Sequence, residues 1–133
     1  MQSTINNFGP LVGRILLAAI FLMSGIGKIG GFAGTAGYMA SKGIPMTDVL
    51  LAITIVIEIG AALMIIAGFK ARLGATALLL WMVPVTFIFH NFWAMPADQQ
   101  MIQQIMFMKN LGLMGGMLYI MAFGSGPMSM DKK

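Results

Sequence analysis

Four long apolar runs decide what this chain can fold into. They cover about residues 10–29, 48–68, 71–90 and 99–123, and each approaches the roughly 20 residues that a helix needs to cross a bilayer core. Only 9% of the residues are charged and 59% are hydrophobic, whereas about 25% of the residues in a soluble domain are charged. The sequence therefore predicts an all-α membrane protein, a bundle of four transmembrane helices.

The four runs nearly fill the chain, so we predict that residues 1–133 form one membrane domain without a separate catalytic domain. The segment between the first two runs, 32-FAGTAGYMASKGIPM-46, mixes aromatic residues with small and polar ones and ends in Gly43-Ile-Pro45. We predict a short segment at the membrane interface. It is either a lid over that end of the bundle or an anchored connection.

The distribution of basic residues predicts the orientation. With four crossings, both termini and the turn between the second and third runs lie on one side of the membrane. The basic residues of that side are Arg14, Lys70, Arg72, Lys132 and Lys133, and those of the other side are Lys28 and Lys42. Because lysine and arginine are enriched on the cytoplasmic side, we predict that both termini are cytoplasmic in a bacterial-type inner membrane.

The composition limits the chemistry. The chain has no cysteine, which excludes thiol redox couples and cysteine-ligated metals, so a cofactor or a partner must carry any redox reaction. A single histidine and 15 methionines spread over several helices favour packing over a metal site, and we predict none. The net charge of +4 is spread over loops and tails, which gives no surface for nucleic acid.

The glycines at the end of the first run resemble a nucleotide motif. Residues 25–30 spell G-x-G-x-x-G, which marks a dinucleotide loop only when a strand precedes it and a helix follows. Here the glycines end a membrane helix, so we reject that interpretation. Gly25 and Gly27 instead predict close helix packing, as do Gly112 and Gly116 in the fourth run.

Two charges are expected near the middle of the membrane. Glu58 lies about ten residues from either end of the second helix, where an ionised carboxylate costs on the order of 3 kcal/mol or more. Lys109, followed by Asn110, lies at a matching depth on the fourth helix at about 1.5 Å per residue. We therefore expect Glu58 to pair with Lys109, or with Arg14 if the arginine reaches inward and does not extend to the lipid headgroups.

Further polar residues continue toward the outer end and predict a column from the bundle centre to the surface. The candidate ligand or proton site residues are Arg14, Lys28, Glu58, His90, Lys109 and Asn110. Each has a structural alternative. The Glu58 pair could fix the register of the helices, Lys28 could anchor the first helix at the headgroups, and His90 beside Trp93 could belong to an interfacial aromatic belt.

Five motifs together resemble the DoxX family of small four-helix inner-membrane proteins. They are 14-RILLAAIFLMSGIGKIGGF-32, 38-YMASKGIP-45, 58-EIGAALMIIAGF-69, 90-HNFW-93 and 108-MKNLGLMGG-116. The resemblance implies a four-helix bundle and puts Gly25 and the six candidate residues on characteristic positions of the family. Some relatives resemble the small subunit of a thiosulfate:quinone oxidoreductase, and others act as the membrane partner of superoxide dismutase and a sulfurtransferase.

The functional hypothesis is a membrane redox-accessory protein that binds a quinone or a similar small amphipathic molecule, at most as a subunit of an oxidoreductase. Lys28, His90 and Asn110 would donate hydrogen bonds to a quinone carbonyl, and the Glu58 pair would manage charge or pass a proton. The alternatives are a scaffold that recruits partner proteins and a transporter of a small solute or of protons. The expected partners are the lipid bilayer and redox proteins, and an oligomer is compatible with the sequence.

Overall fold

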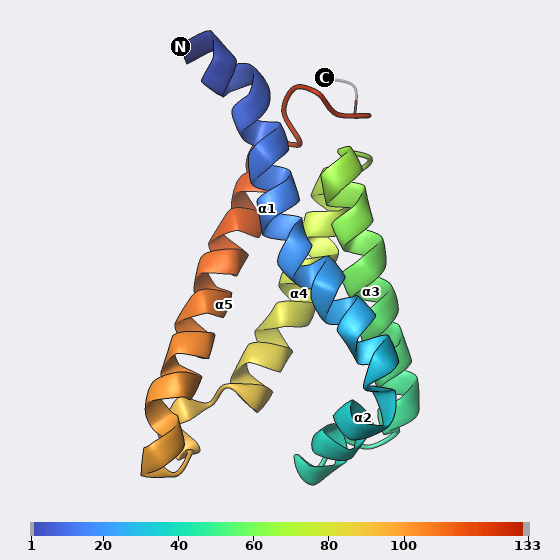
Figure 1. Cartoon of the computed structure of the whole chain (residues 1–133), viewed down its shortest axis with the longest axis vertical. Coiled ribbons are helices and arrows are strands. Elements are labelled where there is room, and N and C mark those ends of the chain that lie inside the picture. The colour runs from blue at the N-terminus through green and yellow to red at the C-terminus, as the bar shows by residue number, and fades with distance from the viewer. Residues whose placement is uncertain (1, 132–133) are drawn as a thin grey trace.

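The computed structural model describes residues 2–131, and these residues form five α-helices and one short 3-10 helix. The elements are α1 (Gln2–Gly30), α2 (Phe32–Ser41), α3 (Thr47–Ala67), α4 (Ala71–Phe89), η1 (Phe92–Ala94) and α5 (Ala97–Phe123). The helices α1, α3, α4 and α5 are long and apolar enough to cross a membrane. The predicted four-helix membrane bundle is therefore confirmed (Figure 1).

The four long helices run along the length of the molecule, and both termini lie at the same end (Figure 1). We call this the termini end, and we call the opposite end, where α2 and η1 lie, the far end. The segment that was predicted between the first two crossings is the helix α2, which lies across the far end and packs on α3.

The first helix is longer than predicted. It begins at Gln2, whereas the sequence predicted a start at Pro10, and it continues through this proline. The apolar run marks only the part that can lie in the hydrocarbon, and the polar residues before it extend the same helix. A hydrogen bond of 3.0 Å from Gln2 Nε2 to Asn6 Oδ1, one turn apart, supports this extension.

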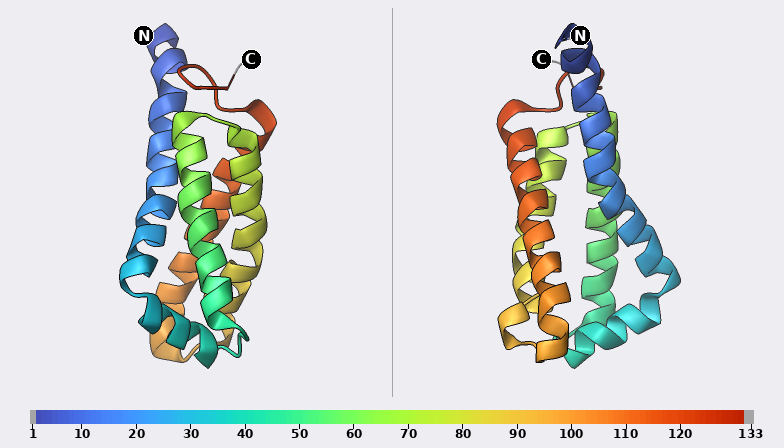
Figure 2. Two further views of the ribbon diagram at one scale, coloured as in Figure 1. Left: turned by 90° about the vertical axis from the view of Figure 1, so that its right-hand side faces the viewer. Right: turned by 60° about the vertical axis from the view of Figure 1, so that its left-hand side comes forward.

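The helices pack in a row that does not close. The extensive contacts join α1 to α3, α3 to α4 and α4 to α5. Small buried residues such as Ala18, Ala62 and Ala75 allow the backbones to approach closely in the core. Helices α1 and α5 meet near the termini end and diverge toward the far end (Figures 1 and 2). The row of helices therefore does not close into a ring between α1 and α5.

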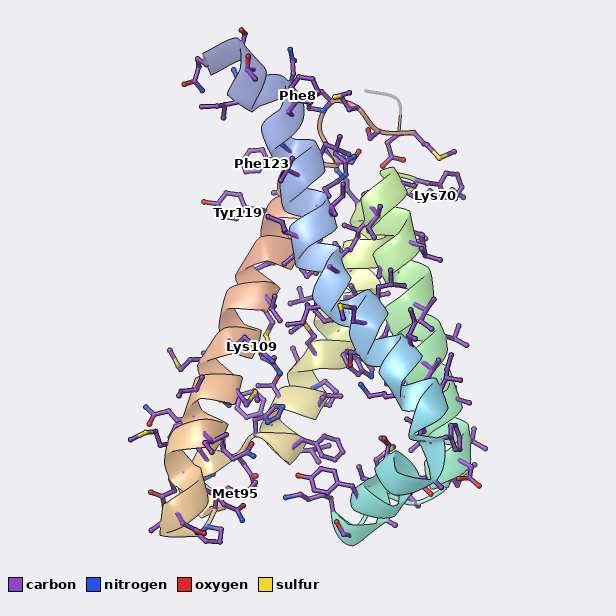
Figure 3. The ribbon with its side chains drawn as sticks, in the orientation of Figure 1. Phe8, Lys70, Met95, Lys109, Tyr119 and Phe123 are labelled. Carbon is purple, nitrogen blue, oxygen red and sulfur yellow. The ribbon has the colours of Figure 1, made fainter. Side chains whose placement is uncertain are left out.

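The outer faces of the helices are apolar, as a lipid environment requires. Phe8, Tyr119 and Phe123 point outward near the termini end, with exposed fractions of 48%, 70% and 73% (Figure 3). The rings of Tyr119 and Phe123 stack with their centroids 5.9 Å apart. Aromatic side chains at this level are typical of a membrane interface.

Two of the four glycines that were predicted to pack helices lie at helix contacts. A Cβ atom at Gly25 would lie 2.6 Å from Ile59 Cγ1 on α3, and one at Gly116 would lie 3.1 Å from Leu17 Cδ2 on α1. Gly27 and Gly112 face open space, with no atom within 4 Å of such a Cβ atom. The sequence motif gave the spacing of the glycines but not the face that each one occupies.

This difference gives a stability prediction with a matched control. Gly25→Ala is expected to lower the free energy of unfolding by about 1–3 kcal/mol, because the added methyl group forces α1 and α3 apart. Gly27→Ala on the same helix is expected to leave it unchanged or to raise it by up to about 1 kcal/mol, since alanine favours the helix. Unfolding by SDS titration in detergent micelles measures both. Equal effects of the two substitutions would contradict the close contact at Gly25.

The residues after α5 fold back over the termini end and are held there by Arg14. Its guanidinium donates hydrogen bonds to the carbonyl oxygens of Ser125, Pro127 and Met128 in this segment and to Ile65 O near the end of α3. The side chain is only 3% exposed. We call residues 124–131 the tail. Arg14 thus neither reaches Glu58 nor extends to the headgroups, and both expectations for this residue are wrong.

Asp131 fixes the other end of the tail at the start of α4. Its carboxylate accepts hydrogen bonds from the amides of Lys70 and Ala71, and its own amide donates 2.7 Å to Gly68 O. These contacts supply acceptors for free amides at a helix N-terminus, where negative charge is favourable. The amides of Ala71 and Lys70 hold the pKa of Asp131 below its ordinary value, against the opposing effect of burial.

The lowered pKa of Asp131 predicts how docking of the tail depends on pH. A carboxyl group with a depressed pKa in the folded state contributes stability above its ordinary pKa and loses it as the pH falls through the lowered value. Protection of the tail amides from hydrogen exchange, corrected for intrinsic rates, should therefore stay constant down to about pH 4 and fall only below it. Asp131→Asn should show weaker protection and no such step. A fall in the protection of the tail amides above about pH 4 in the wild type would contradict the lowered pKa of Asp131.

Candidate functional site

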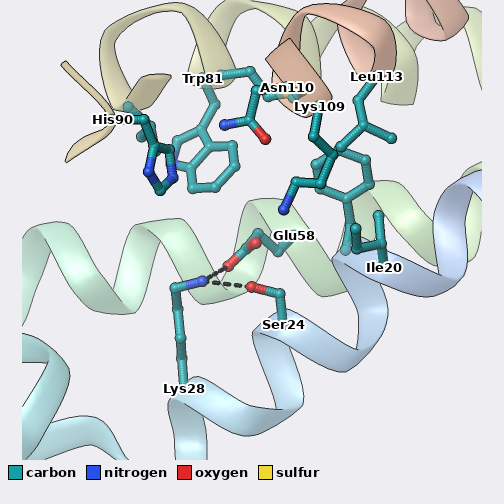
Figure 4. Close-up of a pocket in the computed structure, with 12 residues that line it drawn as sticks. Ile20, Ser24, Lys28, Glu58, Trp81, His90, Lys109, Asn110 and Leu113 are labelled. Carbon is teal, nitrogen blue, oxygen red and sulfur yellow. Dashed lines mark hydrogen bonds and ion pairs between the residues drawn. The ribbon is translucent and has the colours of Figure 1, made fainter. Parts of the chain in front are cut away.

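Glu58 on α3 and Lys28 on α1 form a buried ion pair. Lys28 Nζ lies 2.8 Å from Glu58 Oε1, and the two side chains are 23% and 2% exposed. The same ammonium donates a hydrogen bond of 2.6 Å to Ser24 Oγ, one turn earlier on α1 (Figure 4). Glu58 Oε1 accepts no well-directed hydrogen bond, so its contact with Lys28 is an ion pair by distance alone.

We predicted that Glu58 would pair with Lys109 or Arg14, and both alternatives are wrong. The anchoring role that was considered for Lys28 is also wrong, because its ammonium points into the bundle (Figure 4). The depths of the residues along their helices were a sound guide, but they do not fix the direction in which a side chain points. Gly25 brings α1 against α3, and Lys28, one turn later, therefore meets Glu58.

The ion pair forms one wall of a cavity of about 140 Å³ inside the bundle. The polar or aromatic residues that line it are Phe21, Ser24, Lys28, Glu58, Trp81, His90, Lys109 and Asn110. An apolar cavity of about 150 Å³ in another protein holds a benzene molecule. The cavity is therefore large enough for one six-membered ring, and five of the six candidate site residues surround it, whereas Arg14 does not.

The opposite wall comes from α4 and α5 and carries hydrogen-bonded polar groups. Asn110 is buried and donates from Nδ2 to Thr86 Oγ1 over 3.0 Å. His90 Nδ1 lies 2.8 Å from Gln103 Oε1. In the neutral tautomer that donates to this oxygen, His90 Nε2 keeps a lone pair and is an acceptor. Trp81 also donates from Nε1 to Thr54 Oγ1 over 3.2 Å. These three hydrogen bonds hold the side chains of Asn110, His90 and Trp81 in fixed directions.

Lys109 on α5 lines the cavity, and its side chain is exposed. Its ammonium faces the space between α5 and α1, on the side of Glu58 (Figures 3 and 4). The only hydrogen bond it makes with the described part of the chain goes to Met106 Sδ, at 3.6 Å. Among residues 2–131, no carboxylate lies within ion-pair distance of it. The cavity thus holds two ammonium groups and one carboxylate.

A comparison of the sequence with known families identifies the family of this chain. The model of the DoxX family matches residues 9–91, which include most of α1, all of α2, α3 and α4, and the Lys28–Glu58 pair. The chain belongs to the DoxX family.

Two inner-membrane proteins of Escherichia coli strain K12 are similar to this DoxX protein over nearly their full length. YphA is 35% identical over 123 residues, which are 92% of this chain and 88% of YphA. YqjF is 36% identical over 128 residues, which are 96% of this chain and 93% of YqjF. The surfeit locus protein 4 homologue of Schizosaccharomyces pombe is 31% identical over 127 residues, which are 92% of this chain but 36% of that protein. No solved structure matches the chain.

Sequence reasoning missed several residues around the cavity of this DoxX protein. Ser24 and Trp81 line the cavity, and Thr86, which is fully buried, accepts the hydrogen bond that holds Asn110. The available signal was a polar residue inside an apolar run, because a buried hydroxyl must find a hydrogen-bond partner. In the part of the chain that the structure describes, no three metal-ligating side chains come together.

Proposed function

We propose that this DoxX protein is an inner-membrane accessory protein that binds the ring of a small amphipathic molecule, of which a quinone is our candidate, as a subunit of an oxidoreductase system. The observation that carries the proposal is the buried Lys28–Glu58 pair in the wall of a ring-sized cavity. A buried ionisable pair inside a membrane bundle is expensive, and it marks a functional site more often than a neutral residue does.

The size of the cavity supports a ligand with a small head and a separate tail. At about 140 Å³ it holds a ring but not a long chain, because pockets that enclose whole drug-sized ligands measure about 300–1,000 Å³. The cavity is not fully enclosed, and it lies where α1 and α5 diverge toward the far end (Figure 2). A hydrocarbon tail can therefore stay in the bilayer while the head enters between these helices.

The chemistry of the wall suits a ring that exchanges protons. A quinone, when bound, would take up two electrons and two protons as it is reduced to its quinol. Lys28 can donate a hydrogen bond to a ring oxygen, and the Glu58 carboxylate, 2.8 Å from that ammonium, stabilises its positive charge and can accept a proton that a ring hydroxyl releases on oxidation. His90 Nε2 would accept a hydrogen bond from a ring hydroxyl, which reverses the donor role expected from sequence. The electrons must come from a cofactor or a partner, because the chain has no cysteine to form a thiol redox couple.

The test is mass spectrometry of the organic extract from mildly purified protein. The wild type is compared with Glu58→Gln, and Asp48→Asn serves as the control because Asp48 lies in the first turn of the same helix, away from the cavity. We expect one ring-headed molecule to be retained near stoichiometrically by the wild type and by Asp48→Asn, and to be lost from folded Glu58→Gln. If all three carry only bulk lipid, the proposal is wrong and a scaffold for partner proteins is the better account.

A further inference from the structure

Lys109 presents an unbalanced charge at the cavity. The chain has four acidic side chains in all, and among the described residues none lies within ion-pair distance of Lys109. Glu58 pairs with Lys28, Asp48 and Asp98 lie in the first turns of α3 and α5, and Asp131 caps α4. None of these carboxylates is available to Lys109 in this arrangement of the helices.

The position of Lys109 makes this charge costly. It lies level with Glu58 on the cavity wall, roughly 18 Å along α5 from Ala97 at about 1.5 Å per residue. A lysine side chain near a helix end can extend to the headgroups, but one at this depth cannot reach them without leaving the cavity. Its contact with Met106 Sδ is a weak hydrogen bond and supplies no negative charge.

The charges of the neighbouring groups define what would balance Lys109. The ion pair of Lys28 and Glu58 is neutral as a unit, and the other polar wall residues besides Lys109 carry no charge when histidine is counted as neutral; they are Ser24, Trp81, His90 and Asn110. The cavity therefore has a net charge of one positive unit. A neutral ring would leave this unit uncompensated, whereas a ring that carries one oxyanion would cancel it.

We propose that Lys109 is the counter-ion for a ligand whose ring carries a single negative charge, so that the cavity takes the monoanionic form of a ring-headed amphiphile, a carboxylate or a phenolate. This inference rests on the proposed function and narrows its ligand, since a quinone would meet it only as the monoanion of its quinol, which is a phenolate. The ring lies between α1 and α5 with its oxyanion toward Lys109. The opposite edge of the ring faces the Lys28–Glu58 pair, and the tail extends into the lipid between the two helices.

The chain offers its own reporter for a test. It has two tryptophans, of which Trp81 lines the cavity and Trp93 does not, so Trp93→Phe leaves only the cavity residue to be followed by fluorescence. The protein is placed in nanodiscs of phosphatidylcholine at pH 8. The probes are 4-decylbenzoate and 4-decylbenzamide, which share the ring and the chain and differ in one negative charge. The quantity measured is the ratio of their affinities.

Four proteins with this background are compared: Lys109 unchanged, Lys109→Gln, Lys109→Arg and Lys42→Gln. The last is a control, because Lys42 follows α2 at the far end, outside the cavity. We expect the preference for benzoate to fall about ten- to a hundredfold in Lys109→Gln, since a hydrogen bond to a charged group is lost. Lys109→Arg should keep the preference because it keeps the positive charge, and Lys42→Gln should keep it because Lys42 lies outside the cavity. The partition of each probe into the lipid is the same for all four proteins, so it cancels when their affinity ratios are compared.

The outcomes separate the inference from the proposed function. If both probes change the emission of Trp81 but Lys109→Gln leaves their affinity ratio unaltered, the cavity binds rings and the counter-ion role of Lys109 is overturned. If the preference is lost equally in Lys42→Gln, a general surface potential explains it, and the inference is again overturned. If neither probe changes the emission in any variant, the ring-binding function fails together with the inference.

Discussion

Lys28→Met is expected to lower the free energy of unfolding by about 3 kcal/mol, because it leaves the carboxylate of Glu58 without its partner in the membrane. Glu58 is 2% exposed, and among the described residues Lys28 is the cation at ion-pair distance from it. The effect lies at the lower end of the range for broken buried pairs, since Lys28 keeps some exposure. SDS titration in detergent micelles, followed by far-ultraviolet circular dichroism, measures the change.

A double variant distinguishes the charge effect from a general loss of packing. Lys28→Met combined with Glu58→Gln should recover most of the lost stability, because neither buried charge remains. Lys42→Met is the matched control. Its ammonium lies 5.6 Å from the ring centroid of Tyr38, an exposed contact of about 0.5–1 kcal/mol, so its effect should be smaller. If the double variant were as unstable as Lys28→Met, the ion pair would not be the cause.

The sequence was sufficient for the membrane crossings because they depend on a property that is local along the chain. In lipid, a run of about 20 apolar residues can pair the N–H and C=O groups of its backbone within the segment only as a helix, whatever its neighbours are. The same argument does not fix where a helix ends outside the hydrocarbon. The polar extension from Gln2 to Gly9 therefore escaped prediction, although it continues α1 without a break.

The partners of the buried charges depend on how the helices are rotated about their axes, and the apolar runs carry little information on this. Depth along a helix placed Lys109 correctly at the level of Glu58, since both line one cavity. The choice of Lys28 as the partner follows from the close approach of α1 to α3 at Gly25. A glycine one turn before a charged residue was therefore the signal that could have identified the pair.

The role of Arg14 could not be predicted because its acceptors are main-chain carbonyl groups, which every residue possesses. Side-chain chemistry suggested a carboxylate partner for this arginine. The structure instead places the guanidinium against carbonyl oxygens from two segments that are far apart in the sequence, near Ile65 and in the tail. Only a folded tail brings these groups together, and its glycines at positive φ, such as Gly124 and Gly126, allow the required turns.

Arg14→Met is expected to release the tail and to lower the free energy of unfolding by about 2–5 kcal/mol. The substitution preserves much of the apolar stem but removes the donor to four carbonyl groups, and a buried acceptor without a partner costs about 1–3 kcal/mol. Hydrogen exchange followed by mass spectrometry should show the tail amides losing their protection, while α3 and α4 near the cavity keep theirs.

Arg14→Lys tests whether the shape of the guanidinium or its charge holds the tail. Lysine carries the same charge on a compact ammonium, which cannot span carbonyl groups on opposite sides as the planar guanidinium does. We therefore expect Arg14→Lys to restore only a small part of the protection of the tail. Asp131→Asn should weaken the attachment to α4 while the contacts of Arg14 persist, and its effect should be smaller, about 0.5–2 kcal/mol. If the tail amides of Arg14→Lys were protected as fully as those of the wild type, the positive charge at residue 14 and its attraction to Asp131 would be sufficient to hold the tail, and the shape of the guanidinium would not matter.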